Sequence, residues 1–477
     1  LRNTVVNLLQ TLVEQGVMPR EKAQALVQQA QEKAATDAAA AAAADEGAVR
    51  VTYVPQTVRD EISRQVAEDV RPQLVDDVVA RAKQERWGVP AALPDWLARV
   101  RWSGDVRVRA ESDLYADGNL PQTRLDFLAI NAAGGIDRAG VKAFGNTTED
   151  RHRLRVQARL AMQVALGGGV SAGARVVTGS YGNPVSSNET LGSYTGKFSA
   201  GFDQAYLRWD AAPAERFAFT LQGGRFANPW TTTDLVFDGD LAFDGVALTL
   251  RLPFGAASGR TGAYLTLGAH PLEEVELASH DKWLYGAQLG VDLAFGEQRL
   301  RLASAYYDFR NVQGHRNAFD SVEFDYTAPK YLQRGNTLFD IRNDVATDTN
   351  LFALAGQYEL VDAVASWDAP VWNDVRLGLT GHYVRNIGWK SDEVLRVANL
   401  VADERTDGYS VELALGHRDV LEAGRWRAFF QYRYLQRDAV LDAFTDSDFG
   451  LGGTDLKGYT LGADLGLARN TWLRVRY

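Results

Sequence analysis

The sequence predicts a mostly β fold, a transmembrane antiparallel β-barrel with 16 strands expected and about 15 present in this chain, preceded by an α-helical region. Three observations predict it. Apolar and polar residues alternate with a period of two from about residue 102 onward, and the gaps between the alternating segments are short and long in turn. The first 90 or so residues instead have the spacing of helices.

The composition fits this fold class and excludes others. Mean hydropathy is −0.24, 23% of the residues are charged, and no stretch approaches 18 consecutive apolar residues, so a transmembrane helix is excluded. The 44 glycines and the many aromatic residues suit a barrel whose polar interior keeps the average hydropathy low. The net charge of −10 argues against nucleic acid as a partner. The chain begins without Met, and we expect a processed protein whose signal peptide has been removed.

The N-terminal part is expected to be periplasmic and to contain two helical segments. Residues 1–48 predict a helical hairpin that Gly16 divides. Residues 49–98 predict a short strand followed by a helical, coiled-coil-like segment. Its apolar stripe steps by four residues through Val58, Ile62, Val66, Val70, Leu74 and Val78. Such a stripe with charged flanks predicts either a trimeric bundle or packing on the chain's own hairpin or barrel.

Residues 99–477 predict the barrel. From Arg153 to Val164, arginines and glutamines occupy one face while leucines and valines occupy the other. A row of charged side chains cannot face lipid or a dry core, so it predicts an aqueous interior with the apolar face toward lipid. We expect strands at 102–112, 150–166, 169–180, 199–211, 216–226, 243–252, 261–271, 283–296, 298–310, 348–361, 374–386, 407–418, 425–436, 457–468 and 470–477.

The gaps between these strands alternate in length. Gly167-Gly168 and Gly296-Glu297 are brief, whereas 113–149, 311–347 and 387–406 are long. Short turns on one rim and long loops on the other are typical of outer-membrane barrels. Because bacterial single-chain barrels have an even number of strands, we expect the last strand of the barrel to be missing from this chain or to be hidden in a long loop.

The third long loop, residues 226–245, is the candidate site. Its apolar residues, with Trp230 among them, predict a loop that folds into the barrel. It would present carboxylates from Asp234, Asp238, Asp240 and Asp244. The inward arginines of the first strands would lie opposite as the pore wall, namely Arg107, Arg109, Arg153, Arg155, Arg159 and Arg175. Facing acids and bases across a narrow passage predict a transverse field that orients dipolar solutes. The alternative is a solvated loop and an ordinary lumen lining.

The segments VTYVPQTVRDEISRQV, WSGDVRVRAES, NPWTTTDLVFDGDLAFDG and LGLARNTWLRVRY resemble a family of Gram-negative outer-membrane porins that carry an N-terminal helical region. The resemblance covers the helical region, the first strands, the third loop and the end of the chain. It implies a homotrimeric 16-stranded porin, a passive channel for small hydrophilic solutes and ions that lies in outer-membrane lipid and lipopolysaccharide. It also implies that the third loop is the constriction.

Other functions are weighed against this one. The six histidines are scattered and no HExxH or GxSxG motif occurs, so the sequence does not predict an enzyme. An envelope tether that contacts peptidoglycan through the N-terminal helices, and a substrate-specific channel, are the alternatives. No cofactor is expected. Calcium at Asp442, Asp446 and Asp448 is the alternative to solvated loop acids, although their spacing does not match an EF-hand.

Overall fold

The computed structural model describes residues 99–477 except 215–216, 255–260, 277 and 346–348, together with nine helical residues between Glu21 and Thr36. The chain divides into two compact units, residues 1–93 and 94–477. The nine helical residues lie where the sequence predicts the hairpin. The expected strand and coiled-coil segment over 49–98, with the stripe from Val58 to Val78, lie outside the described residues.

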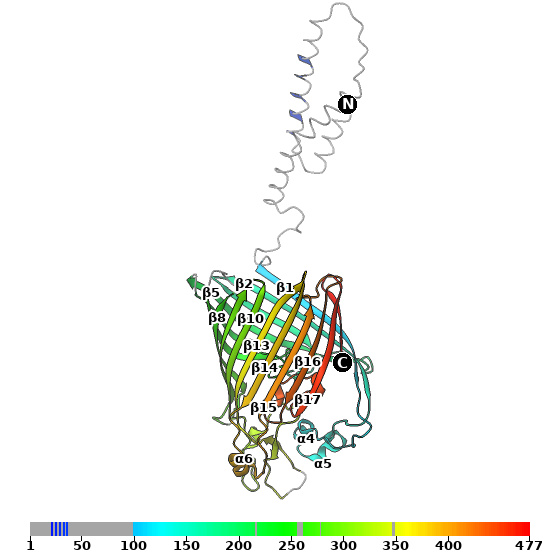
Figure 1. Ribbon diagram of the computed structural model, residues 1–477, viewed down its shortest axis with the longest axis vertical. Helices are drawn as coiled ribbons and strands as arrows, with labels where there is room; N and C mark the ends of the chain where they lie inside the picture. The colour runs from blue at the N-terminus through cyan, green and yellow to red at the C-terminus, as the bar shows by residue number, and fades with distance from the viewer. Residues whose placement is uncertain are drawn as a thin grey trace, which may run out of the picture. The chain divides into compact units, whose positions relative to one another are not determined.

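The second unit is built on one antiparallel sheet in which each long strand is hydrogen-bonded to the next one along the chain. Figure 1 shows the strands running obliquely side by side in chain order. The strands of this sheet are β1 (Val100–Asp113), β2 (Arg151–Gly167), β3 (Val170–Thr178), β5 (Ala200–Ala214), β6 (Phe217–Ala227), β7 (Ala242–Pro253), β8 (Gly262–Glu273), β9 (Lys282–Phe295), β10 (Gln298–Arg310), β13 (Tyr358–Trp372), β14 (Val375–Asn386), β15 (Asp407–Gly416), β16 (Trp426–Leu435), β17 (Leu456–Ala468) and β18 (Thr471–Arg476). A two-residue strand, β4 (Glu189–Thr190), pairs with β2.

The two-residue period therefore predicted the sheet and its order. The alternation of turns and loops is also confirmed, because residues 168–169, 296–297, 373–374 and 469–470 make brief turns, whereas 114–150, 311–357 and 436–455 make long loops. Within the described residues, no hydrogen-bonded ladder joins β1 to β18, so the sheet is not closed into a barrel. The sixteenth long strand stays a prediction.

One strand was placed wrongly. The sequence predicted a strand over 348–361, but the long strand β13 covers Tyr358–Trp372. The apolar residues that precede it form β12 (Phe352–Leu354), which pairs with β11 (Leu338–Asp340) in a separate two-stranded sheet. Pro370 lies inside β13, although a proline in a sequence usually indicates the end of a strand. It lies where the register of β13 with β14 shifts, which is a place where a strand tolerates proline.

The brief turns use residues that tolerate a positive φ. Gly296, Asn373 and Asn470 have φ values of 61°, 46° and 58°. Two-residue hairpins favour such backbone because its twist matches the twist of the flanking strands, and Gly and Asn adopt it most readily.

The two faces of the sheet differ in the way the alternation predicts. Val106 and Val108 of β1 are 74% and 72% exposed on the outer face, whereas Gln157 of the neighbouring β2 is 1% exposed on the inner face. An apolar surface of this kind on the outside of a sheet matches a lipid-facing strand surface. Among the described residues, no helix has both the length and the apolarity to cross a membrane.

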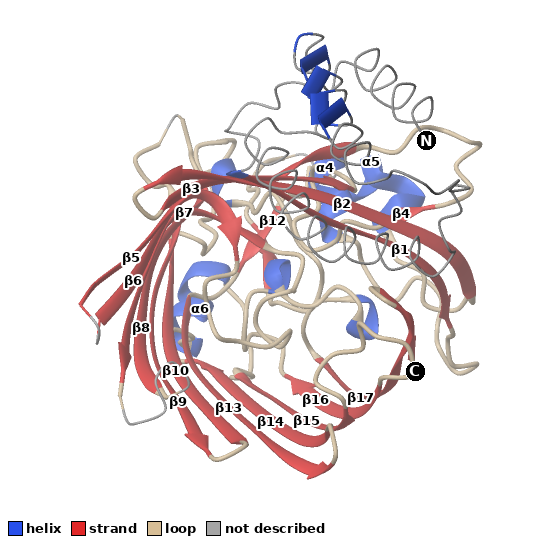
Figure 2. Cartoon of the chain, turned by 90° about the horizontal axis from the view of Figure 1, so that it is seen from above, coloured by secondary structure: helices blue, strands red, loops and turns tan. Residues whose placement is uncertain are grey.

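The inner face encloses parts of the long loops. Figure 2 shows the strands curving around an interior that holds loops and short helices. Buried residues of the β6–β7 loop and of the β16–β17 loop share one hydrophobic cluster with inner-face residues of β6, β10 and β13, such as Phe226, Tyr307 and Tyr358. The helices of the described loops are α4 (Phe127–Ala133), α5 (Ile136–Ala139) and α6 (Ser391–Ala398), with 3₁₀ turns at Gly140–Ala143, Asp325–Thr327, Asp442–Phe444 and Phe449–Leu451.

Candidate functional site

The candidate site is built around the loop between β6 and β7, residues 228–241, here called loop 3. Its apolar side chains are buried against the inner face. Leu235, Val236 and Phe237 are at most 2% exposed. The ring of Trp230 meets that of Tyr307 edge to face at 5.3 Å, and Phe237 meets the same tyrosine at 5.2 Å. Burial of large aromatic residues of this kind is a strong anchor for a loop.

Hydrogen bonds hold the first half of loop 3 deep in the interior. The Thr231 amide donates to Gln288 Oε1 at 2.8 Å, and Gln288 Nε2 donates back to the Thr231 carbonyl at 2.9 Å. Tyr264 Oη donates to Thr231 Oγ1 at 2.7 Å. Gln288 lies near the middle of β9 and Tyr264 lies near the short-turn end of β8. Loop 3 therefore reaches well below the rim from which it starts.

A chain of three side chains, two of them fully buried, holds the middle of loop 3. Thr233 Oγ1 and His382 Nδ1 are 2.6 Å apart, and Nε2 of the same histidine bonds to Asp362 Oδ2. The histidine and aspartate side chains are both fully buried. The threonine comes from loop 3, the histidine from β14 and the aspartate from β13. This arrangement of a hydroxyl, an imidazole and a carboxylate fastens the loop to the wall.

The β16–β17 loop, residues 436–455, packs on the other half of loop 3. The Ser447 amide donates to Asp238 Oδ2 at 2.8 Å, and the Asp238 amide donates to the Phe444 carbonyl, also at 2.8 Å. The Asp446 amide donates to the Asp234 carbonyl at 3.4 Å. Two loops that are far apart in sequence thus form one structure inside the strands.

Three carboxyl groups of these two loops have raised pKa values. Burial raises the pKa of Asp238 to about 7, even though the amides of Asp240 and Ser447 donate to it. Burial also raises the pKa of Asp442 to about 7. The Asp234 side chain is exposed to solvent, but it lies deep among protein atoms. Loss of bulk water, followed by the charge of Asp446, raises its pKa to about 6.

The far end of loop 3 touches the arginine-bearing wall. Asp240 Oδ1 pairs with Arg159 Nη1 of β2 at 3.2 Å. Its Oδ2 accepts from Gln157 Nε2 at 3.2 Å and from Ser187 Oγ at 3.0 Å. Asp234 and Asp240 are therefore the two loop 3 acids that remain accessible, whereas Asp238 is buried at 6% exposure.

The predicted wall arginines do lie on the inner face, and most are paired. Arg109 pairs with Glu111 and with Asp448, the second at 2.7 Å. Arg153 pairs with Glu111 and Asp113, and Arg155 lies 3.5 Å from Glu111. Arg175 pairs with Asp203 at 2.5 Å. Among the described residues, Arg107 makes a single hydrogen bond, from Nη2 to Asn188 Oδ1 at 2.8 Å.

Sequence reasoning missed the arginines of the last strands. Arg433 of β16 is 3% exposed, pairs with Asp446 at 3.0 Å and lies over the ring of Phe449. Arg476 of β18 pairs with Asp448 at 3.2 Å, and Arg474 pairs with Asp464 at 2.5 Å. The signal was present, because Arg474 and Arg476 alternate with apolar residues in the final strand.

Asp448 connects the two ends of the sheet through these arginines. Its Oδ2 accepts from Arg109 of β1 and from Arg476 of β18. Burial opposes ionisation of this carboxyl group. However, the hydrogen bond from Arg109 and the charges of Arg109, Arg476 and Arg107 hold its pKa below the usual value.

Two predictions about acids need correction. Asp244 does not belong with the other loop 3 acids. It lies within β7 beside the buried Phe243, is about half exposed, and pairs with Arg225 of β6 at 3.5 Å. The acids predicted as solvated, Asp442, Asp446 and Asp448, are instead buried or held by arginines. The described residues contain no group of three or more acidic, histidine or cysteine side chains that could hold a metal ion.

Toward the short turns, the inner face carries ion pairs that remain accessible to solvent. Each pair joins side chains of one strand or of neighbouring strands. They are Arg208–Asp210, Arg301–Asp292, Arg376–Asp368, Arg427–Glu412 and Arg474–Asp464. This half of the interior is therefore lined by charged side chains, in contrast to the half filled by the loops.

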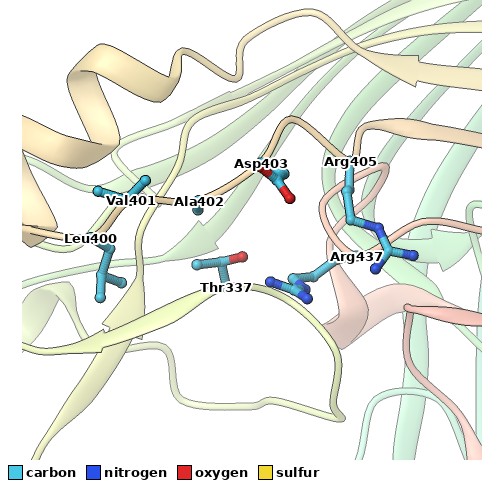
Figure 3. Close-up of a pocket in the computed structure, with 7 residues that line it drawn as sticks. All are labelled: Thr337, Leu400, Val401, Ala402, Asp403, Arg405 and Arg437. Carbon is cyan, nitrogen blue, oxygen red and sulfur yellow. The ribbon is translucent and has the colours of Figure 1, made fainter.

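A separate pocket of about 330 Å³ lies among the long loops. Figure 3 shows Arg405 and Arg437 on one side of it and the apolar Leu400 and Val401 on the other. Both arginines already share Asp455, at 3.0 and 3.8 Å. The pocket therefore offers little free charge to a ligand.

Comparisons with known proteins identify a matching family and several similar solved structures. The family model described as "Putative porin" matches residues 2–477. Solved structures that match include Salmonella typhi OmpF in complex with daunomycin, at 9% identity over 79% of this chain and 89% of that chain with a TM-score of 0.40. Pseudomonas putida OprB matches at 10% identity over 80% and 89% with a TM-score of 0.43. The trimer form of Vibrio cholerae OmpT matches at 10% identity over 79% and 100% with a TM-score of 0.34.

No curated protein matches the chain. The family model, by contrast, covers nearly all of it, from the N-terminal region to the last strand. The sequence patterns, the antiparallel sheet with its apolar outer face, and the charged inner face are those expected of the same class of protein. The chain therefore belongs to this porin family, as an outer-membrane channel protein and not an enzyme.

Proposed function

We propose that the protein is a passive diffusion channel for small hydrophilic solutes and ions, and that loop 3 narrows it. The observation that carries this proposal is the contact of Asp240 with Arg159. It brings a carboxylate of the loop to the middle of the arginine-bearing wall. Solutes would pass beside this contact, along the accessible acids of loop 3 and the arginines of β1, β2 and β18.

The charges on the two sides support a transverse field. Asp234 interacts most strongly with Asp446, Arg433 and Arg476, on the side of the last strands. Asp240 faces the first strands through Arg159. In a narrow passage with few water molecules, fixed charges of opposite sign act more strongly than in bulk water. They would favour dipolar solutes and repel apolar ones.

The direct test is electrical. Purified protein inserted into a planar lipid bilayer in KCl should give stepwise, ohmic increases of conductance. Absence of steps above the lipid background, with insertion verified by protease protection, would contradict the channel.

We also propose that the channel is a homotrimer in outer-membrane lipid and lipopolysaccharide, as the resemblance to trimeric porins implies. The exposed apolar outer face, for example Val106 and Leu160, offers surface for lipid and for neighbouring copies. Light scattering of the detergent-solubilised protein should give three times the chain mass of 52.4 kDa. A monomer mass would contradict the trimer.

A further inference from the structure

The side chains of Arg107 and Arg155 stand out on the inner face because their charges are poorly compensated. Neither of the two has a short ion pair like those of the other wall arginines, because the hydrogen bond from Arg155 Nη1 to Glu111 Oε2 is long, at 3.5 Å. Within the described residues, Arg107 has no carboxylate within ion-pair distance and only the neutral Asn188 as a partner. The nearest carboxylate of Arg155, in Glu111, is 3.5 Å away and is shared with Arg109 and Arg153.

The charge balance of the surroundings leads to the same conclusion. Five guanidinium groups lie in this region with three carboxylates. Four of them, Arg109, Arg153, Arg155 and Arg476, pair with Glu111, Asp113 and Asp448, and Arg107 pairs with none of the described carboxylates. Arg159 lies next to them with two carboxylates, Asp105 and Asp240. The whole row therefore keeps a surplus of positive charge.

Both side chains also keep an unused donor. The Nε atoms of Arg107 and Arg155 are buried and have no hydrogen-bond partner among the described protein atoms. An unsatisfied buried donor is costly, particularly in a charged group, so these atoms favour a ligand that brings oxygen atoms to them. Guanidinium groups bind carboxylate and phosphate oxygens in pairs, through Nε and a terminal nitrogen together.

The strand register puts the two side chains within reach of one ligand. Arg107 lies opposite Gln157, and Arg109 lies opposite Arg155, so Arg107 and Arg155 are diagonal neighbours on the same face. Diagonal Cα atoms on neighbouring antiparallel strands are roughly 7–8 Å apart, which long side chains span easily. Asp240 of loop 3, which bonds to Gln157 opposite Arg107, is the carboxylate with the largest electrostatic effect on Arg107.

We propose that Arg107 and Arg155 form an oxyanion-binding station on the pore wall, which holds the carboxylate or phosphate group of an anionic solute during its passage. The proposal rests on the channel function proposed above and adds the chemical class of the solute. The station binds through geometry as well as charge, because two forked donors approach the same oxygens.

The test is a titration of the chloride current through the full chain in a planar bilayer with inorganic phosphate, and separately with succinate. The station predicts a saturable decrease of the current. Replacement of both arginines (Arg107→Gln with Arg155→Gln) should raise the half-blocking concentration about tenfold or more, since hydrogen bonds to charged groups contribute about that factor. Block by both anions would assign the station to oxyanions in general, and block by one alone would assign it to phosphate or to carboxylate.

The matched control removes two charges from inner-face arginines that are already paired, Arg175 with Asp203 and Arg301 with Asp292. Its variant, Arg175→Gln with Arg301→Gln, should change the half-blocking concentration less than about twofold, because only the general potential changes. The charge-preserving Arg107→Lys should weaken block to an intermediate degree, because lysine lacks the forked donor. This single variant also keeps the test decisive if the double variant fails to fold.

The outcomes distinguish a failure of the binding station from a failure of the proposed channel function. A chain that conducts but shows no saturable block, or a block that both double variants weaken equally, would overturn the station and leave the channel intact. A chain that does not conduct at all would overturn the proposed function.

Discussion

The backbone amide of Ser447 donates a 2.8 Å hydrogen bond to Asp238 Oδ2, across 209 residues of sequence. Oδ1 of the same side chain accepts from the Asp240 amide at 2.7 Å. One buried carboxyl group therefore ties loop 3 to the β16–β17 loop and also fixes the turn that presents Asp240 to the wall.

Replacing this carboxyl group should loosen loop 3. Asp238→Ala leaves the amides of Asp240 and Ser447 without acceptors in a buried place, at a cost of roughly 1–3 kcal/mol each. We expect larger current fluctuations and a higher mean conductance in single-channel recordings. Asp403→Ala, at an exposed loop acid, is the control and should match the unmodified chain. A quiet channel of unchanged conductance in Asp238→Ala would show that the loop is held without this contact.

The raised pKa values predict a pH dependence of the loops. Asp234, Asp238 and Asp442 have pKa values of about 6, 7 and 7 in the folded chain against a usual 3.8. The folded state therefore binds more protons than the unfolded one. Their contribution to stability is fully present below about pH 4 and is lost as the pH rises through 6 to 7. Current fluctuations should thus be smaller at pH 5 than at pH 8. The opposite order would contradict the raised pKa values of these carboxyl groups.

The accessible loop acids should set the ion preference. The variant Asp234→Asn with Asp240→Asn removes two negative charges from the passage. We expect the anion-to-cation permeability ratio to rise by about twofold or more, because a unit charge at 4 Å contributes about 1 kcal/mol even in bulk water. Reversal potentials in a KCl gradient at pH 8 measure this ratio.

Asp244→Asn provides the control for that experiment. The sequence grouped Asp244 with the other acids, but its side chain pairs with Arg225 on the neighbouring strand. Its removal should leave the reversal potential nearly unchanged. A shift as large as that of the double variant would show that Asp244 acts on ions in the passage, and would contradict its placement beside Arg225 on the strands.

The packing of Trp230 should affect the conductance as much as the charges of loop 3 do. Trp230→Ala removes a side chain that is 6% exposed, and such truncations in a core cost about 3–5 kcal/mol. Gly286 lies against the same ring, because a Cβ atom there would be 2.6 Å from Trp230 Cη2. We therefore expect Gly286→Ala and Trp230→Ala to raise conductance alike.

Gly381 of β14 supplies the matched glycine for that comparison. A Cβ atom at Gly381 would meet nothing within 4 Å. Gly381→Ala should therefore conduct like the unmodified chain. Equal effects of the two glycine variants would indicate a general response of the sheet and not the displacement of Trp230.

The sheet could be predicted from the sequence because alternation is a local property. Arg153 to Val164 identify their own inner and outer faces without knowledge of any neighbour. The tenth strand was predicted at the wrong residues because the local signals there conflict. The run at Phe352–Leu354 forms a small separate hairpin, and Asp362 and Pro370 occur inside the true strand, where they resemble breaks.

The candidate site was predictable only in outline. The apolar residues of loop 3 predicted that it packs somewhere, and its contacts with Tyr307 and Gln288 agree with that expectation. The partner loop could not be foreseen, because the contact of Asp448 with Arg109 joins residues 339 positions apart. Nor does alternation reveal which arginines share a carboxylate and which, like Arg107, pair with none in the described part of the chain.

The most direct test of the account asks whether loop 3 lies in the path of the ions. The chain has no cysteine, so one can be introduced at Gly239, which is exposed and where a Cβ atom would meet only Asp234 Oδ1 at 3.8 Å. A charged thiosulfonate reagent added to the open Gly239→Cys channel should lower the current and shift its ion preference. The same reagent on Val401→Cys, at a residue that is 93% exposed among the outer loops, should have little effect. Complete labelling of Gly239→Cys, measured by mass spectrometry, with no change of current would contradict the account.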